Sequence, residues 1–282
     1  MVDLESDIGL QPATFGAVVS ASEFSSPIVG VEPVMGDAVL LTVTVPAAMA
    51  ESVRPGHFFD LLCRLDGSFD PLLRRPYSVF RSDPRHQTLT FLVRPFGRGS
   101  AWLVSRTVGA SLELLGPLGN TYTIAPKSRN LLMVAGGVGA APLVMLTDRA
   151  VAQGLNVTFL MGSADGPGLL SPSMLPSVVE YQVATDDGSK GHHGFVTDLV
   201  GDYVRSHWPD QVFACGPESM YRSLRGAVNP HRTGRRPTVQ VSMERTMACG
   251  LGACLGCVVE TRHGMQASCV QGPVYDMDEI VW

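Results

Sequence analysis

Four cysteines near the C-terminal end constrain the fold of this chain more than any other feature. Cys249, Cys254, Cys257 and Cys269 are spaced C-x4-C-x2-C-x11-C, which is the plant-type spacing for a 2Fe-2S cluster held on four thiolates. The segment between them is rich in glycine, which permits the backbone conformations that turn N–H groups toward sulfur. The spacing therefore predicts an iron-sulfur cluster and a role in moving single electrons.

Two other interpretations of these cysteines are weaker. A structural zinc site more often has two C-x2-C pairs, and a disulfide framework suits a small, cysteine-dense secreted domain. This chain has 282 residues and 6 cysteines, and its acidic start lacks the layout of a secretory signal. Cys63 lies outside the group in a largely apolar run and is expected to be a buried thiol.

Composition divides the chain into three zones, which together predict a multidomain β plus α/β protein. Residues 13–126 contain short β-rich runs broken by Pro and Gly, the pattern of a closed antiparallel β-barrel. Residues 127–230 alternate strands with helices, which indicates a parallel sheet. A breaker-rich linker, Asn229–Pro237, precedes the cluster module at 237–282. The expected barrel strands are 14–19, 39–45, 57–62, 88–94 and 111–115; the α/β zone should contain strands 131–135, 157–161 and 212–214 and helices 141–152, 195–205 and 217–227.

Charge and hydropathy exclude several classes of function. The formal net charge is -5 and there is no basic block beyond two arginine pairs, so neither nucleic acid nor an anionic membrane is an expected partner. The longest apolar run, 131–146, is interrupted by three glycines and a proline and is too short to span a bilayer. With no secretory signal at the N-terminus, a cytoplasmic location is expected.

A tetrapeptide in the barrel zone, Arg75-Pro76-Tyr77-Ser78, is similar to the R-x-Y-S/T element with which the ferredoxin-reductase superfamily holds a flavin. Arg75 can neutralise pyrophosphate charge. Tyr77 offers an aromatic face to the isoalloxazine ring, and Ser78 can hydrogen-bond the flavin edge near N5. By themselves, a strand Tyr and an exposed Arg are commonplace. The Gly-rich turn that contains Gly99 and Ser100 leads into an expected helix, where backbone N–H groups can cradle a diphosphate.

A second glycine-rich turn comes after the first strand of the α/β zone. Gly136, Gly137 and Gly139 precede Pro142 at the opening of a helix, which suits a dinucleotide pyrophosphate; the alternative is a turn with a structural role alone. Cys215-Gly216-Pro217 ends a later strand at the carboxyl edge of the sheet, where open α/β sheets bind ligands. For Cys215 the competing interpretation is a buried core thiol.

The loop after the second strand of this zone bears on the type of nicotinamide cofactor. The segment 162–166, Gly-Ser-Ala-Asp-Gly, has no Arg or Lys placed to pair with a 2'-phosphate. NAD is therefore favoured over NADP.

The most specific stretch of the chain is 242–257, which reads S-x-E-x-x-M-x-C-G-x-G-x-C-x-x-C, followed by Cys269 and Gly-Pro-Val-Tyr-Asp at 272–276. It resembles the family of electron-transfer subunits of NAD-linked dihydroorotate dehydrogenase, and the resemblance runs from about Phe15 to the end. It implies FAD contacts at residues 75–78, at Leu92, Val93 and Arg94, and at Gly99 and Ser100. The chain departs from the family at His57, where Gln is more usual.

The resemblance also implies a partner and a direction for the electrons. An FMN-containing catalytic subunit would oxidise dihydroorotate, and electrons would pass singly through the cluster to FAD and then as hydride to NAD+, in de novo pyrimidine biosynthesis. A heterotetramer is the family expectation, and no catalytic residue is nominated in this chain. One alternative is the small FAD/2Fe-2S subunit of an NADH-dependent ferredoxin:NADP oxidoreductase, a sulfide dehydrogenase or a hydrogenase complex. Another is a zinc-bearing scaffold without flavin.

Overall fold

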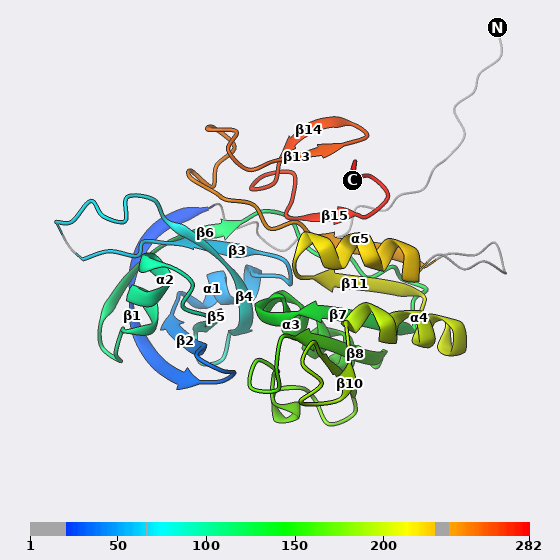
Figure 1. Cartoon of the computed structure of the whole chain (residues 1–282). Coiled ribbons are helices and arrows are strands. Elements are labelled where there is room, and N and C mark those ends of the chain that lie inside the picture. Colours follow the sequence, from blue (N-terminus) through cyan, green and yellow to red (C-terminus); the bar gives the residue numbers. More distant parts are fainter. Residues whose placement is uncertain (1–20, 66, 229–236) are drawn as a thin grey trace, which may run out of the picture.

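The computed structural model describes residues 21–65, 67–228 and 237–282. The expected strand at 14–19, the start of the barrel zone at residue 13 and nearly all of the linker Asn229–Pro237 lie outside the described residues. Figure 1 shows the barrel on one side, the α/β layers on the other, and the C-terminal module above both.

Six antiparallel strands close into the expected barrel, in the order β1-β2-β5-β4-β3-β6. Alternating burial along the last strand puts every second side chain into the interior, as a closed sheet requires. Phe59 fills the centre, with its ring edge-to-face against Phe24 and Phe91 at centroid distances of 6.3 and 5.8 Å. The strands are β1 (Ser22–Pro33), β2 (Val39–Thr44), β3 (Phe58–Leu61), β4 (Arg75–Asp83), β5 (Thr88–Val93) and β6 (Ser111–Leu118), with helices α1 (Ala47–Ser52) and α2 (Arg98–Val104) beside them.

A seven-stranded sheet forms the second layer, in the order β10-β9-β8-β7-β11-β12-β15. Its central strands are buried along nearly their whole length, which matches a parallel sheet covered on both faces. The strands are β7 (Asn130–Gly136), β8 (Asn156–Ser163), β9 (Glu180–Thr185), β10 (His192–His193), β11 (Gln211–Cys215), β12 (Thr238–Ser242) and β15 (Val274–Asp276). The expected strands 131–135, 157–161 and 212–214 are confirmed.

Helices cover the two faces of this sheet differently. α3 (Ala140–Ala152), entered through the short 3-10 turn η1 (Gly137–Gly139), packs between the sheet and the barrel and shares an apolar core with Phe80 and Leu92. α4 (Val196–His207) and α5 (Glu218–Ala227) cover the opposite face. A second 3-10 turn, η2, spans Pro172–Met174. In the described part of the chain, no helix is both long and apolar enough to cross a membrane.

The cluster module is tied to the sheet more closely than a division at residue 237 implies. β12 pairs in parallel with β11, and β15 pairs antiparallel with β12 through Ser242↔Val274. Both strands therefore extend the nucleotide sheet, because their backbone groups need the ladder that the edge of β11 offers. The part that leaves the sheet is the segment 243–273, which contains the hairpin β13 (Val258–Thr261) and β14 (Gly264–Ala267).

Candidate functional site

A cavity of about 710 Å³ lies where the barrel, α3 and the segment after β12 meet, a volume in the range of cofactor sites. Among the expected flavin contacts, Pro76, Tyr77, Ser78, Leu92 and Arg94 line it. Antiparallel pairing places Tyr77 opposite Phe59 and Ser78 opposite Phe58 on the neighbouring strand. Burial raises the pKa of Tyr77, so its ring presents a neutral, apolar face.

Four expected flavin contacts lie outside that lining. The side chain of Arg75 runs beside Gly99, where an added Cβ would stand 3.6 Å from its Nε. Ser100 accepts hydrogen bonds from the backbone N–H groups of Phe96 and Gly97, at 2.8 and 3.0 Å, and so closes the turn into α2. Arg75 and the first residues of α2 thus form one polar corner suited to a diphosphate. Val93, by contrast, is buried in the barrel core.

A second cavity, of about 510 Å³, opens at the carboxyl ends of β7, β8 and β11. The predicted nucleotide residues Gly136, Gly137, Gly139, Gly216 and Pro217 line it. This edge of a parallel sheet is where open α/β folds bind their ligands. The residue set therefore fits a dinucleotide.

The three glycines of this turn serve different purposes. A Cβ on Gly139 would stand 2.3 Å from the carbonyl oxygen of Cys215, and one on Gly136 would stand 2.8 Å from Pro217. Both glycines let the turn pack against the end of β11. Gly137 has φ +53° with open space around it, so it is the one that leaves room for a ligand to approach the backbone.

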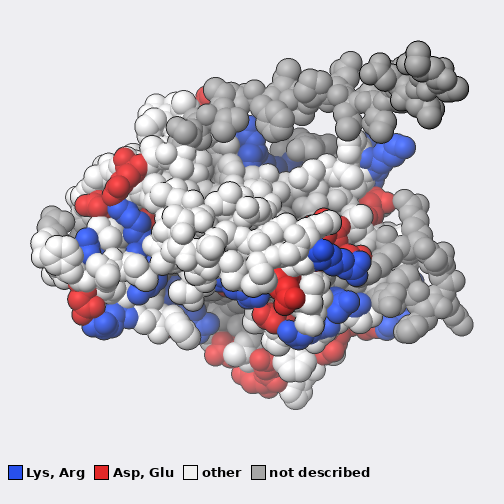
Figure 2. Space-filling view, turned by 90° about the horizontal axis from the view of Figure 1, so that it is seen from above, with Lys and Arg blue, Asp and Glu red and all other residues white. Residues whose placement is uncertain are grey.

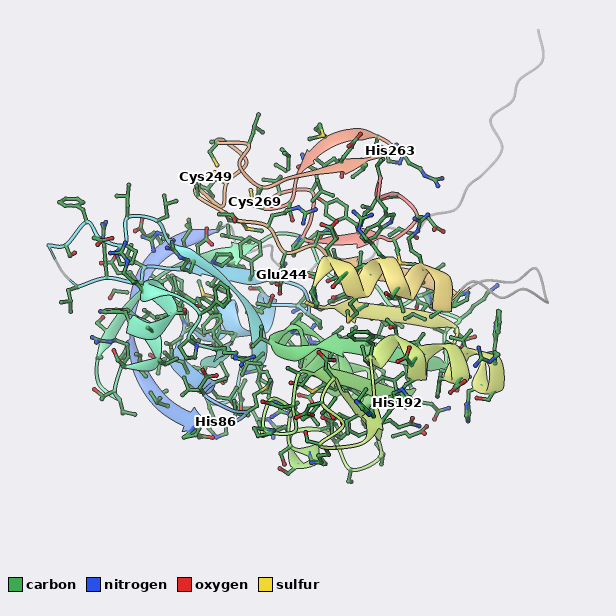
Figure 3. The ribbon with its side chains drawn as sticks, in the orientation of Figure 1. His86, His192, Glu244, Cys249, His263 and Cys269 are labelled. Carbon is green, nitrogen blue, oxygen red and sulfur yellow. The ribbon has the colours of Figure 1, made fainter. Side chains whose placement is uncertain are left out.

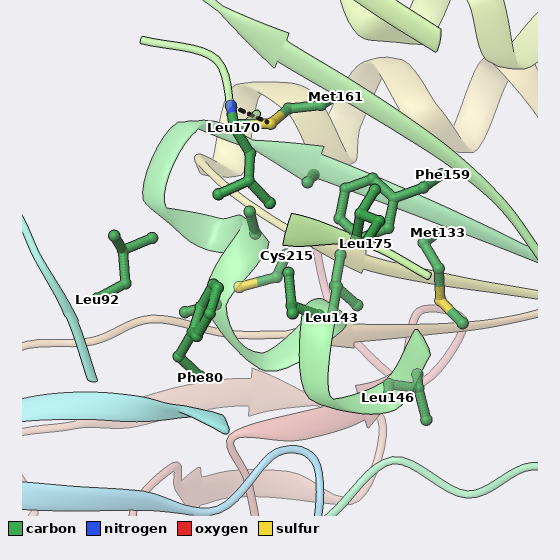
Figure 4. Packing of buried hydrophobic residues seen from close by; sticks show 14 of the residues in the cluster. Phe80, Leu92, Met133, Leu143, Leu146, Phe159, Met161, Leu170, Leu175 and Cys215 are labelled. Carbon is green, nitrogen blue, oxygen red and sulfur yellow. Dashed lines mark hydrogen bonds between the residues drawn. The ribbon is translucent and has the colours of Figure 1, made fainter. Parts of the chain in front are cut away.

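Cys215 does not line either cavity among their described residues. Its side chain is fully buried in the core beneath α3, near Leu143 (Figure 4), and burial raises its thiol pKa well above the ordinary value. The thiol can donate to Oε1 of Glu244 at 3.9 Å. Cys215 as a direct nucleotide contact stays a prediction, and the structure places it one layer behind the pocket wall.

Arg94, Val138 and Glu244 line both cavities, so the two pockets adjoin. Sequence reasoning gave Glu244 no role, although it lies in the S-x-E-x-x-M stretch. Its carboxyl group is open to water through the pockets but surrounded by protein atoms, and this desolvation raises its pKa. Figure 3 shows it below the cluster cysteines, at the junction of barrel and sheet.

The four cysteines of the C-terminal module face a common space. Five backbone N–H groups point at their sulfurs: Leu251 and Cys254 donate to Cys249, Gly252 to Cys269, Gly256 to Cys254 and Cys269 to Cys257, at distances of 3.1 to 3.5 Å. The N–H groups lower the pKa of Cys249 to about 6, which favours the thiolate that binds iron. Gly250 and Gly252 have φ of +68° and +77°, as the sequence predicts.

The four thiols lie close enough together to affect one another's ionisation. Within the described residues, no three His, Cys, Asp or Glu side chains converge closely enough to ligate one metal. The thiols nevertheless interact, because Cys257 and Cys249 both help to raise the pKa of Cys269 to about 12, with burial as the largest cause. Four interacting thiols in this order along the chain suit two irons and their sulfides.

Comparison with known proteins gives the same picture. Residues 244–281 match the iron-sulfur cluster binding domain of dihydroorotate dehydrogenase B. The chain is 33% identical over 234 residues to the dihydroorotate dehydrogenase B (NAD(+)) electron transfer subunit of Shouchella clausii, covering 81% of this chain and 86% of that one. It is 34% identical over 245 residues to the subunit of the same name from Bacillus caldolyticus, covering 85% and 91%.

Solved structures share the fold. The NADH-dependent reduced ferredoxin-NADP oxidoreductase superposes with a TM-score of 0.80 and 25% identity, covering 91% of this chain and 90% of that one. The ferredoxin reductase of carbazole 1,9a-dioxygenase superposes with a TM-score of 0.64 at 24% identity, covering 76% and 68%, and shows the barrel-plus-sheet fold alone.

Proposed function

This chain belongs to the family of dihydroorotate dehydrogenase B electron-transfer subunits, and from that premise we propose that it carries electrons from an FMN-containing catalytic subunit to NAD+ in pyrimidine biosynthesis. A 2Fe-2S cluster and FAD are the carriers within the chain. When bound, FAD exchanges electrons singly with iron and in pairs with nicotinamide. The partner oxidises dihydroorotate, and no site for that substrate is assigned to this chain.

The observation that carries the proposal is that the two cavities share Arg94, Val138 and Glu244. Two cofactors exchange a hydride only when their rings are in contact. A ring seated on Tyr77 and Ser78 in the larger cavity would meet a nicotinamide that enters from the smaller one. Arg94 brings a positive charge to this junction, where its Nε lies 3.1 Å from the carboxylate of Asp37.

Each group has residues suited to hold it. Arg75, Gly99 and Ser100 would bind the FAD diphosphate, while Pro76, Tyr77, Ser78, Leu92 and Arg94 would seat its ring. Gly137 and the backbone around Gly216 and Pro217 would hold the NAD diphosphate. Cys249, Cys254, Cys257 and Cys269 would ligate the cluster. Glu244 would place a carboxyl group beside the reacting rings, and desolvation raises the pKa of that carboxyl above its ordinary value.

The cluster loop is the surface on which we expect the partner to dock. Cys254 is exposed and stands between Leu251 and Leu255, which are 57% and 62% exposed. Seen from above, the middle of this face carries few charges, and charged side chains gather at its margins (Figure 2). An apolar surface beside an exposed ligand suits a tight protein interface. We expect a heterotetramer of two such subunits with two catalytic ones, in the cytoplasm.

The test is an absorption spectrum of the chain, purified anaerobically from its own cells with whatever binds it, before and after dihydroorotate is added. We expect dihydroorotate to bleach flavin and cluster bands in the complex. The isolated chain should be bleached by NADH and left unchanged by dihydroorotate. A complex that responds to NADH and never to dihydroorotate would contradict the proposed pathway and leave the cofactors in place.

A second candidate partner has one observation in its favour, the TM-score of 0.80 with the reduced ferredoxin-NADP oxidoreductase. Under that alternative, reduced ferredoxin and NADPH would exchange electrons with the purified complex, whereas dihydroorotate would do nothing. The same anaerobic spectra, with these donors added in turn, distinguish the two.

A further inference from the structure

Strand β3 stands between the flavin cavity and the cluster cysteines. Phe58, its first residue, pairs with Ser78 on the flavin side and with Leu118 of β6 on the other. The loop that carries Cys249 packs onto the same strand, since a Cβ on Gly250 would stand 2.3 Å from Oδ2 of Asp60. The wall between the two cofactor sites is therefore one strand thick.

Two side chains belong to both sides of this wall. Phe58 and Met247 line the flavin cavity, and they also form a buried apolar cluster with Cys257 and Cys269, the two ligands that face the interior. Phe58 and Met247 are only 2% and 6% exposed. Of the described residues that line the cavity, these are the only two in that cluster.

The contact between the two sites is also buried and held in place by hydrogen bonds. The ring of Phe58 lies against Gly119, where an added Cβ would stand 2.9 Å from its Cε1. Asn120 then joins the end of β6 to the segment after Cys269. Its backbone N–H donates to Gly272, its side-chain amide donates to Gln271 and Val274, and its Oδ1 accepts from the N–H of Val274, at 2.6 to 2.8 Å.

From this arrangement we propose that Phe58 and Met247 form the bridge through which electrons pass between the flavin and cluster sites, and that they keep water out of it. The proposal rests on the proposed function, which places FAD in the larger cavity. The rate of electron tunnelling falls steeply as the gap between donor and acceptor widens. Continuous packing between the two sites therefore matters more than which atoms fill the space. An apolar shell also controls solvent access and polarity around the cluster.

The electron balance of this step needs no other reactant. One electron that leaves the reduced site arrives at the oxidised one, and the bridge itself is neither oxidised nor reduced. Phe58 and Met247 are thus positioning residues, which set distance and dryness. Their removal should affect one step of the electron path more than its neighbours.

The experiment compares Phe58→Leu with Phe91→Leu in the isolated, cofactor-loaded chain. Phe91 is the matched control, because it is fully buried in the barrel core and outside both the cavity and the cluster group. After anaerobic mixing with NADH, stopped-flow absorption follows flavin reduction, and rapid-freeze EPR follows the appearance of reduced cluster. Iron, sulfide and flavin contents are measured for each variant.

We expect Phe58→Leu to slow the reduction of its cluster several-fold more than the reduction of its flavin, while Phe91→Leu changes neither rate. Met247→Ala is the second variant and should show the same selective delay. Equal rates of cluster reduction in wild type, Phe58→Leu and Met247→Ala would overturn the bridge. So would loss of cofactors from both variants with normal contents in Phe91→Leu, because the role would then be structural. A wild-type chain that binds no flavin would instead overturn the proposed function itself.

Discussion

The two cavities and the cysteine loop are built in opposite ways. The cavities lie at strand ends and the first turns of helices, where ladders of backbone hydrogen bonds hold part of the wall. Residues 249–257 contain no helix or strand, and their polar contacts are largely N–H groups aimed at sulfur. The cavities are shaped by the fold before any cofactor arrives, whereas the loop needs iron to complete its bonding.

The four thiols also differ in how deeply they are buried. Cys257 and Cys269 are buried at 1% and 2% exposure, against the barrel, while Cys254 lies at the surface. Two of the four thiols are therefore held in the protein core, and the other two, Cys249 and Cys254, lie nearer the surface.

The largest effect should come from removing a buried ligand. Cys257→Ser should reduce iron content and the cluster EPR signal to background, because a hydroxyl replaces the thiolate at the anchored side of the cage. Reduction of bound flavin by NADH should persist, since none of residues 249–257 lines either cavity. Cys63→Ser is the control, with its buried thiol outside the group. Loss of flavin together with iron would show that the two regions are not independent.

A smaller effect, on the cavity side, should result from a methyl group added to the nucleotide turn. Gly139→Ala would press its Cβ against the carbonyl oxygen of Cys215 and should lower the free energy of unfolding by about 3 kcal/mol. Gly137→Ala meets no neighbour and costs only its positive φ, about 1 kcal/mol. Urea unfolding measures both values. A cost for Gly137→Ala equal to that for Gly139→Ala would contradict the packing argument.

The link between the two regions can be loosened at Asn120. Asn120→Ala removes three side-chain hydrogen bonds between β6 and the segment after Cys269 and should cost about 2 kcal/mol. We expect iron to be lost faster to a chelator, with NADH affinity unchanged. Asn156→Ala, at a surface pair with Asn130, is the control. If the chelator removes iron at the wild-type rate, the hydrogen bonds of Asn120 do not hold the cluster module in place.

The smallest effect should be a pH dependence of stability that arises at His57, the residue before β3. Burial, with Arg54 and Arg149 nearby, lowers the pKa of His57 from 6.5 to about 4. The unfolded chain therefore takes up a proton below pH 6.5 that the folded chain refuses until about pH 4, so stability falls as pH is lowered through this window. At pH 5.5 His57→Gln should be more stable than wild type by about 1 kcal/mol relative to pH 8.

The control for this prediction is the exposed His193, as His193→Gln, measured by urea unfolding at both pH values. A difference between wild type and His57→Gln that stays the same from pH 8 to pH 5.5 would contradict the assignment.

Local pattern was enough to predict the barrel, the central strands and helices of the sheet, and the cluster family, because each depends on residues close together in sequence. Whether Cys215 points into the core or toward the nucleotide cavity could not be predicted, because a parallel strand buried on both sides has no alternation of polarity that would show which way each side chain points. Glu244 and Asn120 were missed for another reason. Each acquires its role only where segments distant in sequence meet, and single residues of these types carry no such signal.

The pairing of Ser242 with Val274 means that the cluster-bearing segment leaves the sheet and returns at adjacent points. Just beyond this pair, the backbone N–H of Met243 donates to the carbonyl oxygen of Pro273 at 2.7 Å and holds the two ends of the segment together. A segment with such neighbouring ends can change in length without shifting the strands of the sheet, provided that Glu244 and Met247 keep their places in the cavity wall. Evolution can lengthen or shorten such a segment while the strands of the sheet keep their register. This offers a simple route by which one flavin-binding fold acquires different redox partners.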